Sequence, residues 1–343
     1  MKSTNYLFQA IGLALLLGLF SCKNNSPEGQ PAEGGATTTQ ASTPAIEELT
    51  LKIKSTPNSA QLYASRGMLW YEHENFDQGI ADLEQAIQLD STRPEYFHTL
   101  ADFYMDYYKS KMALNTMQRA AANFPNRIPT LLKLSEYQLI LQLYNDALFT
   151  LERIRTQEPL NADMFYMFGR VFTEMDKKDQ AIAAFQSAVE SNPDLQDAWV
   201  LLADLLAEKG NPIAAKYYEN ALRLDSNSID ALHAKAYYLS NRKNDLQGAI
   251  AIYKKINTID PQYADGYYNS GLIYLDMDSV EQAYKNFDLA IKMAPTFADA
   301  YYHRGLAAEL KGNAQQAIAD YENVLNFDPD FEGAKAGLKR LKK

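Results

Sequence analysis

The chain has 343 residues, of which 47% are apolar, and a formal net charge of −10. An apolar share of this size is normal for a chain that folds around a core. The negative charge disfavours nucleic acids and anionic membrane surfaces as partners, because both repel an acidic protein. Cys22 is the only cysteine, which excludes an internal disulfide.

The first segment in chain order, residues 1–21, is predicted to be a secretory signal. Its apolar run, residues 11–20, is too short to span a bilayer comfortably. The segment ends in Leu19-Phe20-Ser21-Cys22, which resembles a bacterial lipobox. That resemblance implies a lipoprotein in which Cys22 is lipidated and becomes the first residue of the mature chain. The alternative is an ordinary signal peptide followed by a chance cysteine.

Residues 22–44 are predicted to form a flexible tether. They are rich in Gly, Pro, Thr, Ser and Gln and carry almost no large apolar side chain, so burial cannot offset the entropy cost of ordering them. Lys23 occupies the place where an aspartate retains similar lipoproteins in the inner membrane. The resemblance therefore implies lipid anchoring in the bacterial cell envelope at the outer membrane, on a periplasmic or surface face that stays open.

From residue 60 onward, a pattern of about 34 residues recurs eight times. Its first mark is a small residue: Gly67, Ala101, Ser135, Gly169, Ala203, Ala236, Gly271 and Gly305. Its second is another small residue: Gly79, Ala113, Ala147, Ala181, Ala214, Ala249, Ala283 and Ala317. Four positions later comes a bulky one: Leu83, Met117, Leu151, Phe185, Tyr218, Tyr253, Phe287 and Tyr321. A fixed period of this length indicates a solenoid whose units contact mainly their neighbours.

Each unit is predicted to be a pair of helices joined by a polar turn. In the fourth unit, Phe165, Phe168 and Phe172 recur at helical spacing. Ala181 lies on a second helix that Pro193 ends, because proline lacks the amide that a helix needs. Neither helix can bury its apolar face alone, so the stacking of neighbours must supply the core.

Two short segments identify the repeat more closely. Tyr63-x2-Arg66-Gly67-x2-Trp70 is similar to a W-x2-L-G-x2-Y segment, and Ala181 to Phe185 follows an A-x3-F pattern. These segments resemble the tetratricopeptide repeat, and the resemblance covers residues 60–331. It implies an all-α, right-handed superhelical solenoid with capping helices at residues 45–59 and 332–343. The eight units are residues 60–93, 94–127, 128–161, 162–195, 196–228, 229–263, 264–297 and 298–331.

The resemblance also implies that a partner binds on a concave face lined by the first helix of each unit. The residues expected to line this groove are His98, Asp102, Asp106, Glu136, Tyr166, Arg170, Glu174, Asp204, Glu208, His233, Tyr237, Tyr268, Asp276, Tyr302 and Glu309. Such a groove would be acidic and aromatic, with Arg170 as its lone strong cation. It would suit a basic or neutral segment of a protein or peptide. Tyr166, Tyr268 and Tyr302 have a second interpretation, as packing between adjacent helices.

No catalytic role, cofactor or metal is expected. The four histidines lack the spacing of metal ligands, and the repeats leave no room for a catalytic domain. We therefore predict an envelope-anchored scaffold that holds a protein or peptide partner and supports assembly of an envelope or secretion complex. A glycan-binding surface lipoprotein is the alternative, because an aromatic groove could stack sugars. The sequence leaves the oligomeric state and the identity of the partner open.

Overall fold

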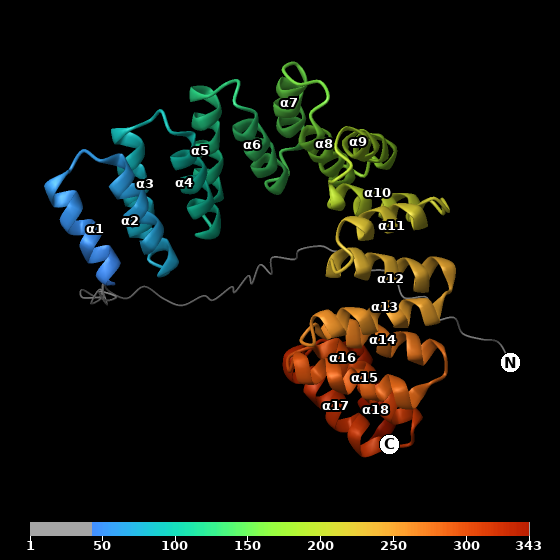
Figure 1. The fold of residues 1–343 in the computed structure, drawn as a ribbon. Coiled ribbons are helices and arrows are strands. Elements are labelled where there is room, and N and C mark those ends of the chain that lie inside the picture. Colours follow the sequence, from blue (N-terminus) through green and yellow to red (C-terminus); the bar gives the residue numbers. More distant parts are fainter. Residues whose placement is uncertain (1–42, 343) are drawn as a thin grey trace, which may run out of the picture. The chain divides into compact units, whose positions relative to one another are not determined.

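The computed structural model describes residues 43–342, and every regular element within them is a helix (Figure 1). The signal segment, the lipidation site Cys22 and most of the predicted tether lie outside the described residues. No helix among residues 43–342 is long and apolar enough to cross a membrane.

The helices form consecutive pairs. The first helices are α2 (Ala60–Glu72), α4 (Pro94–Asp106), α6 (Ile128–Ile140), α8 (Ala162–Glu174), α10 (Gln196–Glu208), α12 (Ile229–Lys243), α14 (Ala264–Asp276) and α16 (Ala298–Leu310). The second helices are α3 (Phe76–Leu89), α5 (Ser110–Asn123), α7 (Tyr144–Arg155), α9 (Lys178–Ser191), α11 (Ala214–Leu224), α13 (Leu246–Ile259), α15 (Val280–Met293) and α17 (Ala314–Phe327). Before and after the pairs come α1 (Pro44–Ser55) and α18 (Glu332–Leu341). Each first helix begins at the residue that opens its sequence unit.

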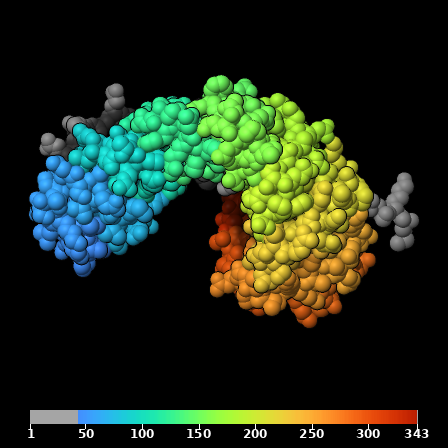
Figure 2. All heavy atoms as spheres, turned by 45° about the horizontal axis from the view of Figure 1, so that its top comes forward, coloured from blue at the N-terminus to red at the C-terminus, as the bar shows by residue number. Residues whose placement is uncertain are grey.

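Contacts between helices follow the order of the chain. Each first helix packs on its second helix, and each second helix packs on the first helix of the next unit. First helices of successive units also meet, as α6 does with α8 and α10 with α12. Figure 2 shows the same sequential order, because neighbouring colours adjoin along residues 43–342. The arrangement is an all-α superhelical solenoid, which confirms the predicted fold class.

The core consists of the small and bulky series recognised in the sequence. All eight bulky residues are at most 2% exposed, and the alanines of both small series are fully buried. The contact is closest at Gly169, where an added Cβ would lie 2.5 Å from the ring of Phe185. At Gly271 the same atom would lie 2.6 Å from Phe287. These small residues let the two helices of a pair approach closely, as the sequence predicts.

The turn inside each pair contains one residue in the left-handed region. These residues are Glu74, Tyr108, Gln142, Asp176, Gly210, Asn244, Asp278 and Gly312, with φ between 54° and 76°. Each lies two residues after the last residue of its first helix in all units but the sixth, where Asn244 follows the longer α12 directly. The left-handed residue reverses the chain so that the second helix can pack back on the first.

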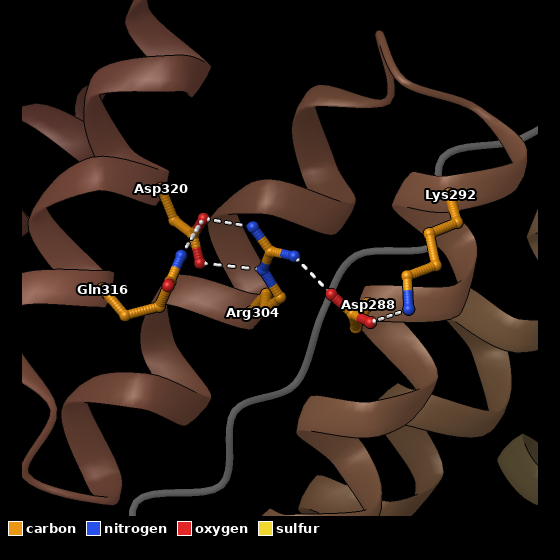
Figure 3. Close-up of polar contacts among 5 residues, drawn as sticks. All are labelled: Asp288, Lys292, Arg304, Gln316 and Asp320. Atoms are coloured by element: carbon orange, nitrogen blue, oxygen red, sulfur yellow. Dashed lines mark hydrogen bonds and ion pairs between the residues drawn. The ribbon is translucent and has the colours of Figure 1, made fainter.

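A largely buried arginine side chain, 18% exposed in one case and 12% in the other, occurs at the same place in the first and eighth units. Arg304 on α16 donates from Nε and Nη2 to Asp320 on α17 (3.0 and 2.6 Å) and from Nη1 to Asp288 on α15 (2.7 Å), as Figure 3 shows. Gln316 also donates to Asp320, and Lys292 pairs with Asp288. The guanidinium therefore joins the second helices of the seventh and eighth units.

Arg66 makes the corresponding bonds at the other end. It donates from Nε and Nη2 to Asp82 on α3, both at 2.7 Å, and from Nη1 to Thr50 on α1 at 3.1 Å. Because α1 packs on α2 in the way that a preceding second helix would, it closes the first unit.

Candidate partner-binding face

All the predicted groove residues lie on first helices, from α4 to α16. We call the surface that these helices share the first-helix face. Its electrostatics differ from the expectation, because most of its cations come from positions that the sequence analysis did not assign to the groove. Whether a partner binds there stays a prediction.

Four of the predicted carboxylates are paired with cations. Asp102 lies 2.8 Å from Lys133 Nζ, and Glu136 lies 3.6 Å from Arg170 Nη1. Glu208 lies 2.5 Å from Lys178 Nζ. Glu309 accepts two hydrogen bonds from Arg340 on α18, at 2.9 and 3.1 Å. The expectation that Arg170 is the lone strong cation is therefore wrong.

Tyrosine hydroxyls hold further carboxylates from neighbouring helices. Tyr137 donates to Asp102 at 2.6 Å, and Tyr218 on α11 donates to Asp204 at 2.5 Å. Protein surrounds the Asp204 carboxyl even though part of the residue is open to solvent, and this desolvation raises the pKa of Asp204 to about 6. Tyr71 donates to Asp106, and burial together with that carboxylate raises the pKa of Tyr71 to about 12.

The last residue of a first helix is a carboxylate in five units. These residues are Glu72, Asp106, Glu174, Glu208 and Asp276, and all five are exposed. A negative charge at a helix C-terminus opposes the helix dipole at a cost of about 0.3–1 kcal/mol. Within residues 43–342, only Glu208 of the five pairs with a cation, and Glu72, Glu174 and Asp276 accept no hydrogen bond. We call these five residues the carboxylate row.

Most of the predicted groove tyrosines are half-buried and pack against other rings of the array. Tyr268 has its ring centroid 4.8 Å from that of Phe297, and its hydroxyl lies 3.3 Å from His303 Nδ1. Tyr302 lies 4.9 Å from Phe331, and Tyr166 lies 5.9 Å from Phe185, between ring centroids. These contacts favour the packing interpretation for all three. Tyr237 on α12 differs, because 40% of it is exposed.

The predicted groove histidines also lie between first helices. His98 Nε2 lies 3.0 Å from Thr130 Oγ1 on α6, and His233 Nε2 lies 3.4 Å from Asn269 Nδ2 on α14. Burial lowers the pKa of His98 and of His233 below the ordinary histidine value. In residues 43–342, no group of three or more His, Cys, Asp or Glu is arranged to hold a metal ion.

Sequence reasoning missed the cations because they come from other elements or other positions. Lys133 lies at the sixth residue of the third unit, Lys178 begins a second helix, and Arg340 lies beyond the last unit. A scan of the helix termini for charges that oppose the dipole would have found the carboxylate row.

Comparison with known proteins gives a family match, sequence relatives and similar solved structures. The model of the family described as tetratricopeptide repeat matches residues 166–229 and 268–330. The human protein O-mannosyl-transferase TMTC3 is 24% identical over 232 residues, which are 65% of this chain and 25% of that protein. The match thus spans about a quarter of the length of this relative.

Two solved structures have a similar backbone over most of their length. One is the C-terminal part of a repeat protein from Cytophaga hutchinsonii, with a TM-score of 0.55, 18% identity, and coverage of 70% of this chain and 99% of that one. The other is PilW, a type IV pilus biogenesis factor, with a TM-score of 0.54, 18% identity, and coverage of 61% and 96%. The matched repeats support a relationship to the tetratricopeptide repeat family, and the paired helices and the two solved neighbours show its fold.

Proposed function

We propose that this protein is a scaffold that binds a basic segment of a protein partner along the carboxylate row. The solenoid fold supports a role in protein interaction, since it presents a long surface rather than an enclosed pocket. The finer statement, that the partner is basic, rests on the row itself.

The carboxylate row carries the proposal because three of its five members, Glu72, Glu174 and Asp276, oppose the helix dipole with no hydrogen bond or ion pair in residues 43–342 to offset the cost. Five helix C-termini bear a negative charge against the dipole, and four of them have no cation partner in the described part of the chain. Local features that oppose folding preferences are expected at functional sites. Lysine or arginine side chains of a partner would neutralise both the carboxylates and the negative ends of the helices.

The rival functions have less support. A glycan-binding surface needs exposed aromatic rings, and Tyr166, Tyr268 and Tyr302 instead pack against other rings. We also propose that the chain is not an enzyme. The transferase activity in the name of the human relative belongs to that protein, of which the match spans a quarter.

We further propose that the scaffold is anchored in the bacterial envelope through lipidated Cys22, and that it supports assembly of an envelope complex. The sequence Leu19-Phe20-Ser21-Cys22 supports the anchor. The test is the partitioning of the Cys22→Ala protein into a detergent phase. The lipid anchor predicts loss of partitioning, and a processed variant that partitions like the parent would contradict it.

The test of the partner site neutralises two members of the row. Glu174→Gln combined with Asp276→Asn should reduce capture of the native partner from an envelope extract, and added salt should reduce capture by the parent protein. Tyr237→Ala should weaken capture further if the exposed ring contacts the partner.

The matched control removes two charges elsewhere in the same array. Glu190→Gln combined with Asp194→Asn makes an equal change of charge on the exposed end of α9 and the loop that follows. This control should capture the partner as well as the parent does. Equal loss in both double variants would indicate a general charge effect, and no loss in either would remove the row from the partner site.

A further inference from the structure

A hollow lies between the second helices of the second and third units. Its walls are α5 and α7, and its floor is α6, on which both second helices pack. Its volume is about 450 Å³, which is within the range of sites that hold small ligands or peptide side chains. The first-helix face does not include the walls of this hollow, because they are second helices.

The middle of the hollow is apolar and includes a side chain that is small for its place in the repeat. Ala121 on α5 takes the position that Ile87, Val189 and Ile291 occupy in other units, where each is at least 92% buried. Ala121 has fewer aliphatic atoms than these residues and lines the hollow, although only 4% of it is exposed. On the opposite wall, Phe149 on α7 is 69% exposed. An exposed ring beside a small-residue gap offers a place for an apolar side chain from outside.

The floor carries a mostly buried glutamine whose amide nitrogen is open to the hollow. Gln138 on α6 is only 5% exposed, and its Oε1 accepts a hydrogen bond from Thr150 Oγ1 at 2.8 Å. Its amide nitrogen has no hydrogen-bond partner among residues 43–342, and the side chain lines the hollow. This nitrogen is not among the buried atoms that lack a partner in the described residues, so solvent reaches it in the free protein and a peptide carbonyl would replace that water.

The two ends of the hollow carry opposite charges. Asp146 and Arg153 are seven residues apart on α7, which corresponds to about 10 Å along the helix. Neither forms an ion pair within the described range of the chain, and Arg153 donates only to the carbonyl oxygen of Pro125, at 3.1 Å. The hollow therefore has an acidic end, an apolar middle and a basic end.

We propose that this hollow binds an extended peptide segment of a protein partner, in which one apolar side chain lies between a basic and an acidic residue. The apolar side chain would lie between Ala121 and Phe149, and a main-chain carbonyl would accept the free hydrogen bond of Gln138. A span of about 10 Å corresponds to about three residues of extended chain. The opposite charges would pair with Asp146 and Arg153. This site is separate from the carboxylate row, so either can fail without the other.

The test uses two blocked peptides as probes. Acetyl-Lys-Ala-Leu-Ala-Glu-amide carries the proposed pattern, and acetyl-Lys-Ala-Gly-Ala-Glu-amide has the same charges without the apolar side chain. The full-length chain, labelled on alanine methyl groups, is titrated with each while NMR follows Ala121 and Ala122. The leucine peptide should shift both methyl signals to saturation, and the glycine peptide should not.

Variants then locate the contact. Ala122→Phe fills the hollow from an exposed position and should abolish the saturable shift of Ala121, whereas Gln88→Phe, at the matching exposed position of α3, should leave it unchanged. Gln138→Met should weaken the leucine peptide about tenfold through loss of one donor. Arg153→Gln should weaken it roughly threefold, as expected for a partly exposed ion pair.

Three results would overturn the proposal. The first is equal shifts with the leucine and glycine peptides, and the second is normal binding by Ala122→Phe. The third is a shift of the Ala121 and Ala122 signals that depends on protein concentration without peptide, which would identify a second copy of the chain as the occupant.

Discussion

At the scale of single residues, the register of the array depends on which small residue faces which large one. The sequence predicted these partners because both series recur at a fixed phase, and Ala181 and Phe185 are fully buried as expected. Ala183, two residues from Ala181 on the same helix, is exposed. The two alanines therefore offer a direct comparison of a core position and a surface position.

Ala181→Arg should destabilise the protein by about 3 kcal/mol or more, because it overpacks the core and buries a charge without a partner. Ala183→Arg should change the free energy of unfolding by less than about 0.5 kcal/mol. Urea unfolding followed by circular dichroism measures both. Similar midpoints for the two variants would mean that the assigned register is wrong.

A second residue-scale prediction concerns His303 on α16. Burial lowers the pKa of His303 below its ordinary value of 6.5, so the folded chain holds a neutral imidazole among Tyr268 and Phe287. Below about pH 6.5 the unfolded chain takes up a proton that the folded chain does not, so stability is full above that pH and falls as the pH decreases. Asp204 acts in the opposite sense, because its pKa is raised to about 6.

His303→Phe should remove the part of the acid destabilisation that this histidine causes. The urea midpoints of parent and variant should keep a constant difference above pH 7 and converge toward, or shift in favour of, the variant as the pH falls to 5.5. His73→Phe, at an exposed position, should leave the pH profile of the parent unchanged. Parallel profiles for His303→Phe and parent would contradict the assignment.

At the scale of elements, the turn inside each pair is the feature that the sequence could not predict. Gly210 and Gly312 indicate most directly that the position needs a positive φ, and Asp176, Asn244 and Asp278 are of types that adopt this region more readily than most residues. The other units use residues such as Glu74 and Tyr108, which adopt this region at a cost that the tertiary contacts of the pair offset. The length of the repeat unit predicted where the turn between the two helices lies. The left-handed conformation of the turn residue did not follow from the residue types in most units.

Two substitutions separate the backbone cost from side-chain contacts. Tyr108 is 89% exposed, so Tyr108→Gly should stabilise the protein by roughly 0.5–1 kcal/mol, because glycine adopts positive φ without strain. Gly312→Ala should destabilise it by about 1 kcal/mol, although the added Cβ meets no atom within 4 Å. Thermal unfolding measures both changes. Opposite signs for either would indicate that side-chain contacts, not backbone strain, dominate the turn.

The ion pairs of the candidate site are a second feature that the sequence could not predict, because they join different elements. The positions of the carboxylates on first helices followed from the phase of the repeat. Their charge balance did not, because Lys178 reaches Glu208 from the preceding unit and Arg340 reaches Glu309 from α18. The repeat pattern describes each unit separately, so it does not predict ion pairs between units. The sequence analysis therefore predicted a first-helix face that is more acidic than the structure shows.

At the scale of the whole array, stability is expected to pass between neighbours only. Helix contacts join each unit to the next, and the buried arginines occur in the first and eighth units alone among the eight. Their carboxylate partners are buried, with Asp320 fully inaccessible and Asp82 at 6% exposure. Each arginine also bonds to the second helix that precedes its own unit, Asp288 on α15 in one case and Thr50 on α1 in the other. We infer that these two clusters hold the terminal units to the array.

Removing one arginine should loosen only its own end. Arg304→Leu leaves the buried Asp320 without its ion-pair partner and with only the hydrogen bond from Gln316, at a cost of about 3 kcal/mol or more, and Arg66→Leu removes the ion-pair partner of Asp82. Because coupling is between nearest neighbours, amide hydrogen exchange should accelerate in α15 to α18 for Arg304→Leu and in α1 to α3 for Arg66→Leu. The opposite end of the array should keep the protection of the parent, so each variant is the control for the other.

Arg340→Gln breaks only an exposed pair with Glu309 and should change exchange little. Faster exchange along the whole chain in either arginine variant would show that the array unfolds as one cooperative unit, and the clusters would then stabilise the molecule globally rather than its ends.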